Sequence, residues 1–210
     1  MKKIYFVRHG ESEGNAFETH QSEKTPLTAT GQSQAEMIAN RFSKIQVDLI
    51  IASPCLRTQQ TAQTIAGKNN LQIVTNDLFT EKKGPSQLIG LSQKSELSKK
   101  VRKEIHIHAL DQDGHWQYAD EETAFEFMQR INNILKFISH RPEENLVITS
   151  HALTLKMILA QILYPTGNLK DLYTIYKNFH LNNTGLSVAS YNEQAKEWEL
   201  ICINDYSHLG

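Results

Sequence analysis

Short apolar runs alternate along this chain with stretches that have the periodicity of a helix. The runs 4–7, 49–51, 146–149 and 185–190 have the length and composition of buried strands, and 198–203 is a fifth. Strands that alternate with helices are typical of an α/β fold with a largely parallel sheet. We therefore predict a three-layer α/β/α sandwich with a mostly parallel central sheet and an inserted cap-like segment.

Four stretches between these runs indicate the helices that would cover the sheet. Apolar residues recur at helical spacing over 35–45 and again over 125–138. A third helix is expected from the Ser-Pro pair at 53–54 to about residue 66, because serine is a good N-cap and proline suits the first helical position. A fourth is expected over 155–162.

The segment 79–119 does not follow this alternation. It is polar and locally basic, and we interpret it as an insertion over one edge of the sheet, within a single domain of residues 1–210. Its lysines fit a solvated surface without a role equally well. The IHIH stretch would place His106 and His108 on one face of a strand. An ordinary polar face is favoured over a metal site there, because no matching carboxylates or cysteines lie nearby.

Composition and charge exclude several classes of protein. A formal charge of -1 on 210 residues gives no global basic surface, so nucleic acid is not an expected partner. Two cysteines, Cys55 and Cys202, are too few for a disulfide framework and favour a reducing compartment. The apolar run after Met1 is too short for a secretory signal, and no apolar stretch has the length of a membrane span. We expect a cytoplasmic protein with no membrane partner.

Three predicted strands end at side chains suited to an anion. The first leads to Arg8 and His9, the second leads through Pro54 to Arg57, and the run before His151 leads directly to it. Ligands of parallel sheets bind beyond the carboxyl ends of the strands, so these side chains should meet in one electropositive pocket. Arginine offers a planar fork of donors to phosphate oxygens. The expected ligand is a phosphoryl group.

A histidine in such a pocket can react with the phosphoryl group as well as bind it. Neutral imidazole is nucleophilic near physiological pH, and a ring nitrogen about 3–3.5 Å from phosphorus would accept the group. Expelling an alkoxide then requires a proton donor. A carboxylic acid suits this role, and the same group would later activate water as a base.

The stretch VRHGESEGN at residues 7–15 resembles the signature of the histidine phosphatase superfamily, in the branch that includes phosphoglycerate mutases. The resemblance runs from residue 4 to about 190, and it implies an enzyme that needs no metal and no cofactor. Further motifs follow in that family's order: PLTATGQSQA (26–35), SPCLRTQQTA (53–62), LFTEKKG (78–84), DEETAFEFMQR (120–130) and VITSHA (147–152).

The resemblance implies a role for each residue that matches a motif. His9 is implied as the nucleophile that becomes phosphohistidine. Arg8, Arg57 and His151 are implied as the groups that hold the phosphoryl oxygens and stabilise the charge that develops on them, with His151 counted among the catalytic residues. Asn15 matches a position that often contacts the same phosphate.

The proton donor lies in the region whose sequence varies most among such proteins. Glu81 matches the general acid, and Glu96 and Glu122 stay open as alternatives. The aromatic stretch 115–118 either faces the substrate or packs the insertion onto the domain. The NNTG stretch at 182–185 is expected to turn the chain near the pocket.

The predicted function is hydrolysis of phosphate monoesters through a phosphohistidine on His9. The residues after Glu81 are Lys-Lys-Gly-Pro rather than the Arg-Tyr pair expected of a glycolytic mutase, so hydrolysis is favoured over transfer of the phosphoglycerate mutase type. A catalytically inactive phosphate-binding protein is a second alternative. The basic segment 79–119 favours a small substrate with additional negative charge, such as a sugar phosphate, a nucleotide or a phosphopeptide. Oligomeric state is not predicted.

Overall fold

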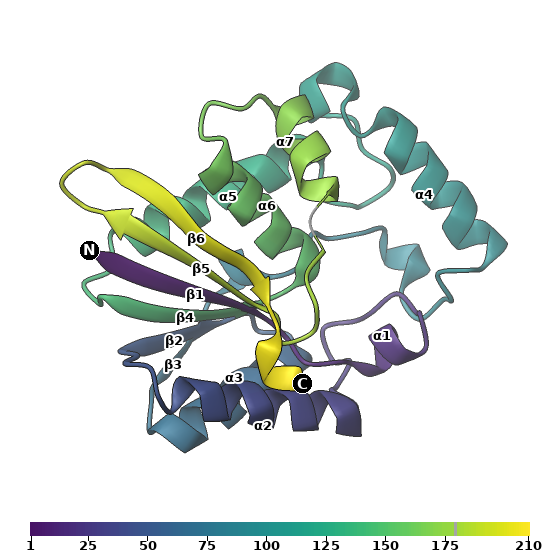
Figure 1. Ribbon diagram of the computed structural model, residues 1–210. Coiled ribbons are helices and arrows are strands. Elements are labelled where there is room, and N and C mark those ends of the chain that lie inside the picture. Colours follow the sequence, from purple (N-terminus) through teal and green to yellow (C-terminus); the bar gives the residue numbers. More distant parts are fainter. Residues whose placement is uncertain (179) are drawn as a thin grey trace.

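A six-stranded sheet forms the centre of the computed structural model, which describes residues 1–178 and 180–210 (Figure 1). The strands are β1 (Lys2–Arg8), β2 (Leu49–Ala52), β3 (Ile73–Thr75), β4 (Asn145–Ser150), β5 (Leu186–Asn192) and β6 (Glu197–Asp205). They lie in the order β3-β2-β4-β1-β5-β6. The first four in this order are parallel, whereas β5 pairs antiparallel with β1 and β6 antiparallel with β5. The sheet is mostly parallel, as predicted.

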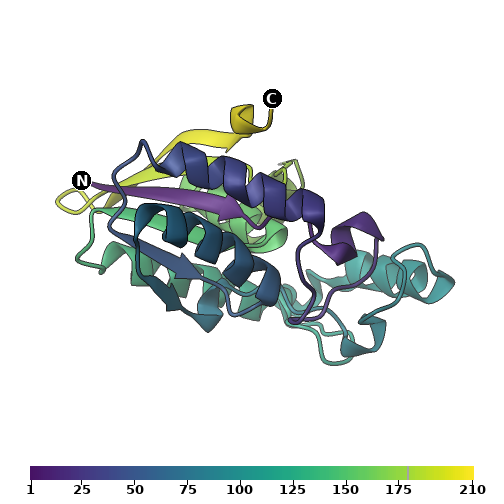
Figure 2. The same ribbon diagram turned by 90° about the horizontal axis from the view of Figure 1, so that it is seen from below.

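Helices cover both faces of this sheet, which confirms the three-layer prediction (Figures 1 and 2). One face packs against α2 (Ala29–Phe42) and α3 (Leu56–Asn69). The other face packs against α5 (Ala124–Ser139), α6 (Ala152–Leu163) and α7 (Leu169–Lys177). The short α1 (Glu13–Ala16) and α4 (Glu96–His108) lie outside the layers, and 3₁₀ turns occur at Asp77–Phe79, Ser86–Leu88, Asp111–Gly114 and Ser207–Leu209. No helix among the described residues is long and apolar enough to cross a membrane.

The first strand shows why the apolar runs carry no polar alternation. Ile4 and Phe6 belong to the core beneath α5 and α6, whereas Tyr5 and Val7 belong to the core beneath α2 and α3. Successive side chains of a strand point to opposite faces, so a strand covered on both sides must be apolar throughout. This arrangement fixes β1 in the middle of the sheet, with its carboxyl end between those of its neighbours.

One helix of the structure differs from the sequence prediction in where it begins, and another has a cap that the sequence analysis did not name. Helix α3 begins at Leu56 with Cys55 as its N-cap, so the Ser-Pro pair precedes the helix. Helix α5 is capped by Thr123, whose hydroxyl accepts from the main-chain N–H of Glu126 while that glutamate bonds back to the cap. This reciprocal pairing satisfies two N–H groups that the first helical turn leaves free.

The inserted segment 79–119 is more regular than its sequence suggests, because it contains α4. Leu97, Val101 and Ile105 recur at helical spacing in it, but only Ser98 and Val101 are buried, so this apolar stripe is short and lies in an otherwise polar segment. His106 and His108 therefore lie on a helix rather than a strand, and residues two apart on a helix do not share a face. The strand β3, of three residues, was also not predicted.

The carboxyl ends of β1, β2 and β4 open toward the side of the molecule that carries α1 and α4 (Figures 1 and 2). There the segment after α1 runs beside the insertion. The main-chain N–H of His20 donates to the Leu91 carbonyl (2.9 Å), and that of Gly90 donates to the His20 carbonyl (2.8 Å). The two segments thus form a connected rim beyond the strand ends.

Candidate active site

His9 directly follows β1, and only 3% of this residue is exposed. Its main-chain N–H donates to the Ser150 carbonyl at the end of β4 (3.0 Å), which ties two strand ends together. The ring Nδ1 lies 2.7 Å from the Gly10 carbonyl oxygen. Because a carbonyl only accepts, Nδ1 carries the proton of the neutral ring and the lone pair lies on Nε2. His9 therefore has an unprotonated Nε2 available as a nucleophile.

Two arginines accompany this histidine, and each keeps an unused donor. Arg8 Nη1 donates to the Leu181 carbonyl (2.7 Å), and Arg57 Nη1 donates to the Ser22 carbonyl (2.9 Å). The Nε atoms of both side chains are buried and form no hydrogen bond with any described residue. Burial lowers the pKa of both guanidinium groups, and the negative charge of Glu81 opposes this shift. Buried cations with unused donors favour the binding of an anion.

His151 directly follows β4 and is held through both of its ring nitrogens. Arg57 Nη2 lies 3.1 Å from Nδ1, and because a guanidinium only donates, Nδ1 is the acceptor. The neutral ring then carries its proton on Nε2, which lies 2.8 Å from Ser53 Oγ and donates to it. The ring centroids of His9 and His151 are 5.3 Å apart. The structure thus brings together side chains that follow three different strands.

Both imidazoles are kept neutral by their surroundings. Burial lowers the pKa of His9 well below its ordinary value, and the charges of Arg57 and Arg8 lower it further. Burial likewise lowers the pKa of His151, with the charge of Arg57 as the next cause. Since neutral imidazole is the nucleophilic form, this environment keeps His9 reactive below the pH at which a free histidine titrates.

Two asparagines fix the backbone beside the first histidine. Asn183 Nδ2 donates to the His9 carbonyl (2.9 Å) and to Asn15 Oδ1 (3.2 Å). The same Oδ1 accepts from the main-chain N–H of Ser12 (3.2 Å) and caps α1. Asn15 Nδ2 forms no hydrogen bond within the described part of the chain, so it stays available as a donor. Asn183 was not predicted from the sequence, although its NNTG stretch was expected to turn near the pocket.

Glu81 is joined to the first turn of α6, immediately after His151. Its Oε2 accepts from the main-chain N–H of Leu153 (3.0 Å), and its Oε1 accepts from the N–H (3.0 Å) and the hydroxyl (3.2 Å) of Thr154. The main-chain N–H of Lys82 adds another donor to Oε1 (3.0 Å). The candidate acid is thus fixed beside the second histidine.

The comparison with protein families decides what this arrangement belongs to. The model of the histidine phosphatase superfamily (branch 1) matches residues 4–205. The chain belongs to the histidine phosphatase superfamily. A protein of Hydrogenobacter thermophilus assigned as phosphoserine phosphatase 2 is 28% identical over 210 residues, covering 99% of this chain and 98% of that protein. The Escherichia coli protein assigned as phosphoglycerate mutase GpmB is 27% identical over 216 residues, covering 100% of this chain and 95% of its own.

Solved structures share the fold of this superfamily member over its whole length. The phosphoserine phosphatase of Entamoeba histolytica, determined with 3-phosphoglyceric acid, has a TM-score of 0.79 at 22% identity, with 100% of both chains covered. The mycobacterial glucosyl-3-phosphoglycerate phosphatase, determined with VO3, has a TM-score of 0.75 at 18% identity, covering 97% of this chain and 99% of that one. The recognition made from the ordered motifs is confirmed.

The two alternative acids of this superfamily member, Glu122 and Glu96, do not contact the first turn of α6 as Glu81 does. Both carboxylate oxygens of Glu122 are engaged by Arg130, through Nε and Nη2 at 2.7 Å each. The side chain of Glu96 is 91% exposed on α4 and pairs with Lys99. The structure therefore brings Glu81, and neither alternative, to the turn that begins at His151.

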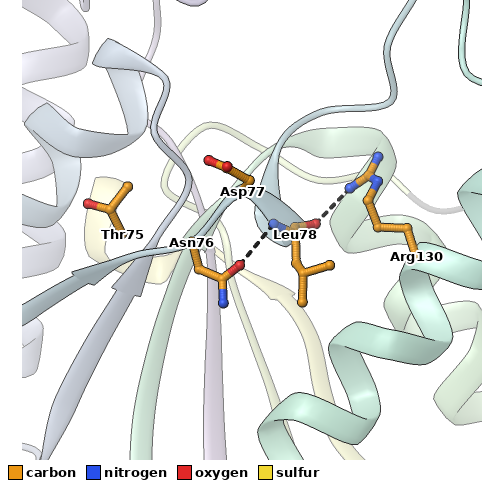
Figure 3. Close-up of a pocket in the computed structure, with 5 residues that line it drawn as sticks. All are labelled: Thr75, Asn76, Asp77, Leu78 and Arg130. Atoms are coloured by element: carbon orange, nitrogen blue, oxygen red, sulfur yellow. Dashed lines mark hydrogen bonds between the residues drawn. The ribbon is translucent and has the colours of Figure 1, made fainter.

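A separate open cavity of ≈ 430 Å³ lies at the carboxyl end of β3 (Figure 3). It is lined by Thr75, Asn76, Asp77, Leu78 and Arg130. Arg130 Nη1 donates to the Leu78 carbonyl (2.7 Å), and its other nitrogens are paired with Glu122. This arginine is already neutralised, so the cavity lacks the unpaired cations that distinguish the His9 site.

The aromatic stretch of the insertion makes packing contacts. The ring of His115 lies 4.0 Å from that of Phe125 on α5, and the ring of Trp116 lies 5.2 Å from that of His108 on α4. These contacts tie the insertion to the layers. Among the residues that the structure describes, no group of three or more His, Cys, Asp or Glu side chains has the arrangement of a metal site.

Proposed function

We propose that this protein hydrolyses small phosphate monoesters through a phosphohistidine formed on His9 Nε2. The observation that carries the proposal is the state of this ring, with Nδ1–H held by the Gly10 carbonyl and a free Nε2 beside two buried cations. Such a nitrogen is an activated nucleophile, and the cations stabilise the charge that spreads over the transferring oxygens. No step of this mechanism is assigned to a metal ion.

In the first step, the lone pair of His9 Nε2 forms a bond to phosphorus while the bond between phosphorus and the ester oxygen breaks. Arg8, Arg57 and the free Nδ2 of Asn15 bind the phosphoryl oxygens. The departing oxygen takes a proton from the carboxylic acid form of Glu81. Oε2 is the atom suited to carry that proton, because it accepts one hydrogen bond from the described residues whereas Oε1 accepts three.

In the second step, water attacks phosphorus and the bond between phosphorus and Nε2 breaks, returning the lone pair to His9. The carboxylate of Glu81 takes the proton from this water and is again an acid for the next turnover. His151, whose Nδ1 already meets Arg57, fixes the guanidinium that holds the phosphoryl group. Inorganic phosphate then leaves.

Transfer of the phosphoglycerate mutase type is the second candidate, since one relative is assigned as a phosphoglycerate mutase. The surroundings of Glu81 favour hydrolysis. Lys82 Nζ donates to the Glu122 carbonyl (2.8 Å) and pairs with Glu121 (3.7 Å). The lysine that follows Glu81 is therefore already paired, and it is not free to hold a substrate in place as a mutase requires. The names of two relatives, a phosphoserine phosphatase and a glucosyl-3-phosphoglycerate phosphatase, also support hydrolysis of a small phosphorylated compound.

Phosphate release from a panel of esters, measured in excess EDTA, tests this proposal. We expect wild type to release phosphate. His9→Ala should lose at least about 10³-fold in kcat, since removing the nucleophile of an enzyme that forms a covalent intermediate costs at least that much. His140→Ala serves as the control, because this exposed histidine contacts only the end of α5. Turnover that persists in His9→Ala contradicts the mechanism.

Trapping the intermediate, together with analysis of the products, distinguishes hydrolysis from mutase-type transfer and from phosphate binding without turnover. Rapid acid-free quenching of wild type with a ³²P-labelled ester should leave label on the protein in an acid-labile, base-stable bond that is absent from His9→Ala. Isomerisation of a phosphorylated sugar acid without release of phosphate would favour the mutase. Binding of phosphate without any turnover would favour the inactive protein.

A further inference from the structure

Lys156 is a cation of α6 that the mechanism above does not use. Most of the helix faces the core, and its neighbours Leu155 and Met157 are buried. Lys156 is partly exposed, as are Ala152 and Leu153, which lie four and three residues before it on the same helix. These spacings place the three residues on one face of the helix. This face leaves the apolar core at the end of the helix that carries His151.

The direction of a helical side chain places the ammonium group close to the candidate acid. Side chains of an α-helix lean toward its N-terminus, so Lys156 extends over the turn formed by Ala152 and Leu153. The main-chain N–H of Leu153 is bound to Glu81 Oε2 (3.0 Å). Lys156 therefore lies on the side of the site where the ester oxygen would leave.

The electrostatics of Lys156 agree with this placement. Burial lowers the pKa of Lys156, the positive charge of Arg8 lowers it further, and the negative charge of Glu81 opposes the shift. Its Nζ forms no hydrogen bond or ion pair with the residues that the structure describes. A half-buried ammonium with three donors, repelled by a neighbouring cation and left unpaired, is suited to bind an anion.

A tyrosine of the adjoining helix approaches the same carboxylate. Tyr176 lies on α7, and burial raises the pKa of its hydroxyl, with the charge of Glu81 as the next cause. Its ring meets that of Tyr173 at 5.0 Å, edge to face, which fixes it against the core. The hydroxyl forms no hydrogen bond with other described residues, so it is available as a second donor on this side.

We propose that Lys156 binds a second anionic oxygen group of the substrate, on the part that leaves as the alcohol. This inference rests on the proposed function, since Arg8 and Arg57 hold the transferring phosphoryl group and Glu81 contacts the ester oxygen. A group that reaches Lys156 must lie a few bonds from that oxygen. The preferred substrates are therefore small phosphate esters with a nearby carboxylate or second phosphoryl group, rather than simple alkyl phosphates.

Matched pairs of esters test this inference. Phosphoserine and phosphoethanolamine differ only in a carboxylate, and inositol 4,5-bisphosphate and inositol 4-phosphate differ only in a neighbouring phosphoryl group. We expect wild type to prefer the more anionic member of one pair at least tenfold in kcat/KM, and Lys156→Met to lower that preference about tenfold, as for loss of one hydrogen bond to a charged group. The pair that responds identifies the anionic group.

Two further variants serve as controls. Lys156→Arg should keep most of the preference, because it keeps the charge, and Lys170→Met, at an exposed lysine of α7, should leave it unchanged. The inference is overturned if wild type shows no preference in either pair, or if Lys156→Met keeps the preference, while release of phosphate from p-nitrophenyl phosphate would still support the proposed function. If wild type hydrolyses no ester at all, both proposals fall.

Discussion

At the scale of single residues, one hydroxyl helps to hold the second histidine in its orientation. Ser53 is fully buried, and its Oγ is the acceptor for the Nε2–H of His151. Arg57 occupies the other ring nitrogen, so the two contacts together fix both the tautomer and the orientation of the imidazole. Under the proposed function, Ser53 is thus a positioning residue that acts through His151.

Ser53→Ala should lower kcat/KM about tenfold and also lower Tm, because a buried N–H that loses its acceptor costs about 1–3 kcal/mol. The nitrogen NMR spectrum of His151 should show an unprotonated Nδ1 in both proteins, because Arg57 still donates to it. The Nε2–H signal should shift, and exchange faster with water, in the variant, because it has lost its acceptor. Ser98→Ala provides the matched control. Ser98 is also fully buried, and its hydroxyl bonds to the Ser92 carbonyl (2.8 Å) on the insertion.

The comparison of the two serine variants separates positioning from stability. Both should lose Tm, but only Ser53→Ala should change kcat/KM and the histidine spectrum. If Ser98→Ala lowers kcat/KM equally, or if the Nε2–H signal of His151 is unchanged in Ser53→Ala, then Ser53 does no more than fill the core.

At the scale of elements, two glycines explain how a loop and a helix can meet beside the nucleophile. Gly31 lies in the first turn of α2, where an added Cβ would stand 1.9 Å from the Glu11 carbonyl oxygen. An added Cβ on Gly10 would stand 2.4 Å from the Gly31 carbonyl oxygen. The obstacles are backbone atoms, which cannot turn aside as a flexible side chain would. The PLTATGQSQA motif therefore supports the loop that follows His9.

Gly31→Ala should destabilise the protein by about 1–3 kcal/mol, because the clash forces the backbone of the loop or of α2 to move. It should also lower kcat, since the loop carries the carbonyl that holds His9. Gly67→Ala is the matched control on α3, because an added Cβ there meets nothing within 4 Å. That variant should gain about 0.4–1 kcal/mol through a less flexible unfolded chain. Urea unfolding of both variants measures the contrast, and equal stabilities would contradict the packing argument.

Helix α6 links three functions through a single N-terminus. His151 precedes its first turn, Glu81 accepts the N–H groups of that turn, and Lys156 leans over it. A displacement of this helix would therefore move the histidine that meets Arg57, the candidate acid and the candidate substrate cation together. The arrangement explains why these groups come from distant parts of the chain and still keep one geometry.

At the scale of the whole molecule, the buried histidines couple the site to the stability of the fold. The pKa values of His9 and His151 lie well below the ordinary value of 6.5, mainly because of burial. Below that pH the unfolded chain binds more protons than the folded protein. The stability due to these groups is thus fully present above about pH 6.5 and falls as the pH is lowered.

The free energy of unfolding should accordingly decrease from pH 7 to pH 5, by at most about 1.4 kcal/mol per pH unit for each histidine that stays neutral. Burial also lowers the pKa values of His20 and His208, which add to the same trend. Urea unfolding at several pH values measures the slope. His9→Gln should make it shallower, and His140→Gln, at an exposed site, should leave it unchanged. A slope that His9→Gln does not alter would contradict this account.

The sequence by itself determined the α/β class, because apolar runs buried on both faces and amphipathic stretches at helical spacing leave few other arrangements. It also placed Arg8, His9, Arg57 and His151 after the ends of three parallel strands, and such ends meet at one edge of a sheet. The ordered motifs indicated the superfamily through their resemblance to its signature.

The tertiary structure decided what local patterns do not contain. The helix α4 buries only two of its residues and β3 has only three residues, so neither has a long apolar pattern. The contacts of Asn183 with His9 and of Ser53 with His151 join residues far apart in the chain, and such contacts exist only once the sheet is assembled. Likewise, only the assembled fold brings Glu81, rather than Glu96 or Glu122, to the N-terminus of α6. Local sequence patterns determine where helices and strands form, whereas the packing of these elements determines which of their polar atoms form hydrogen bonds with one another.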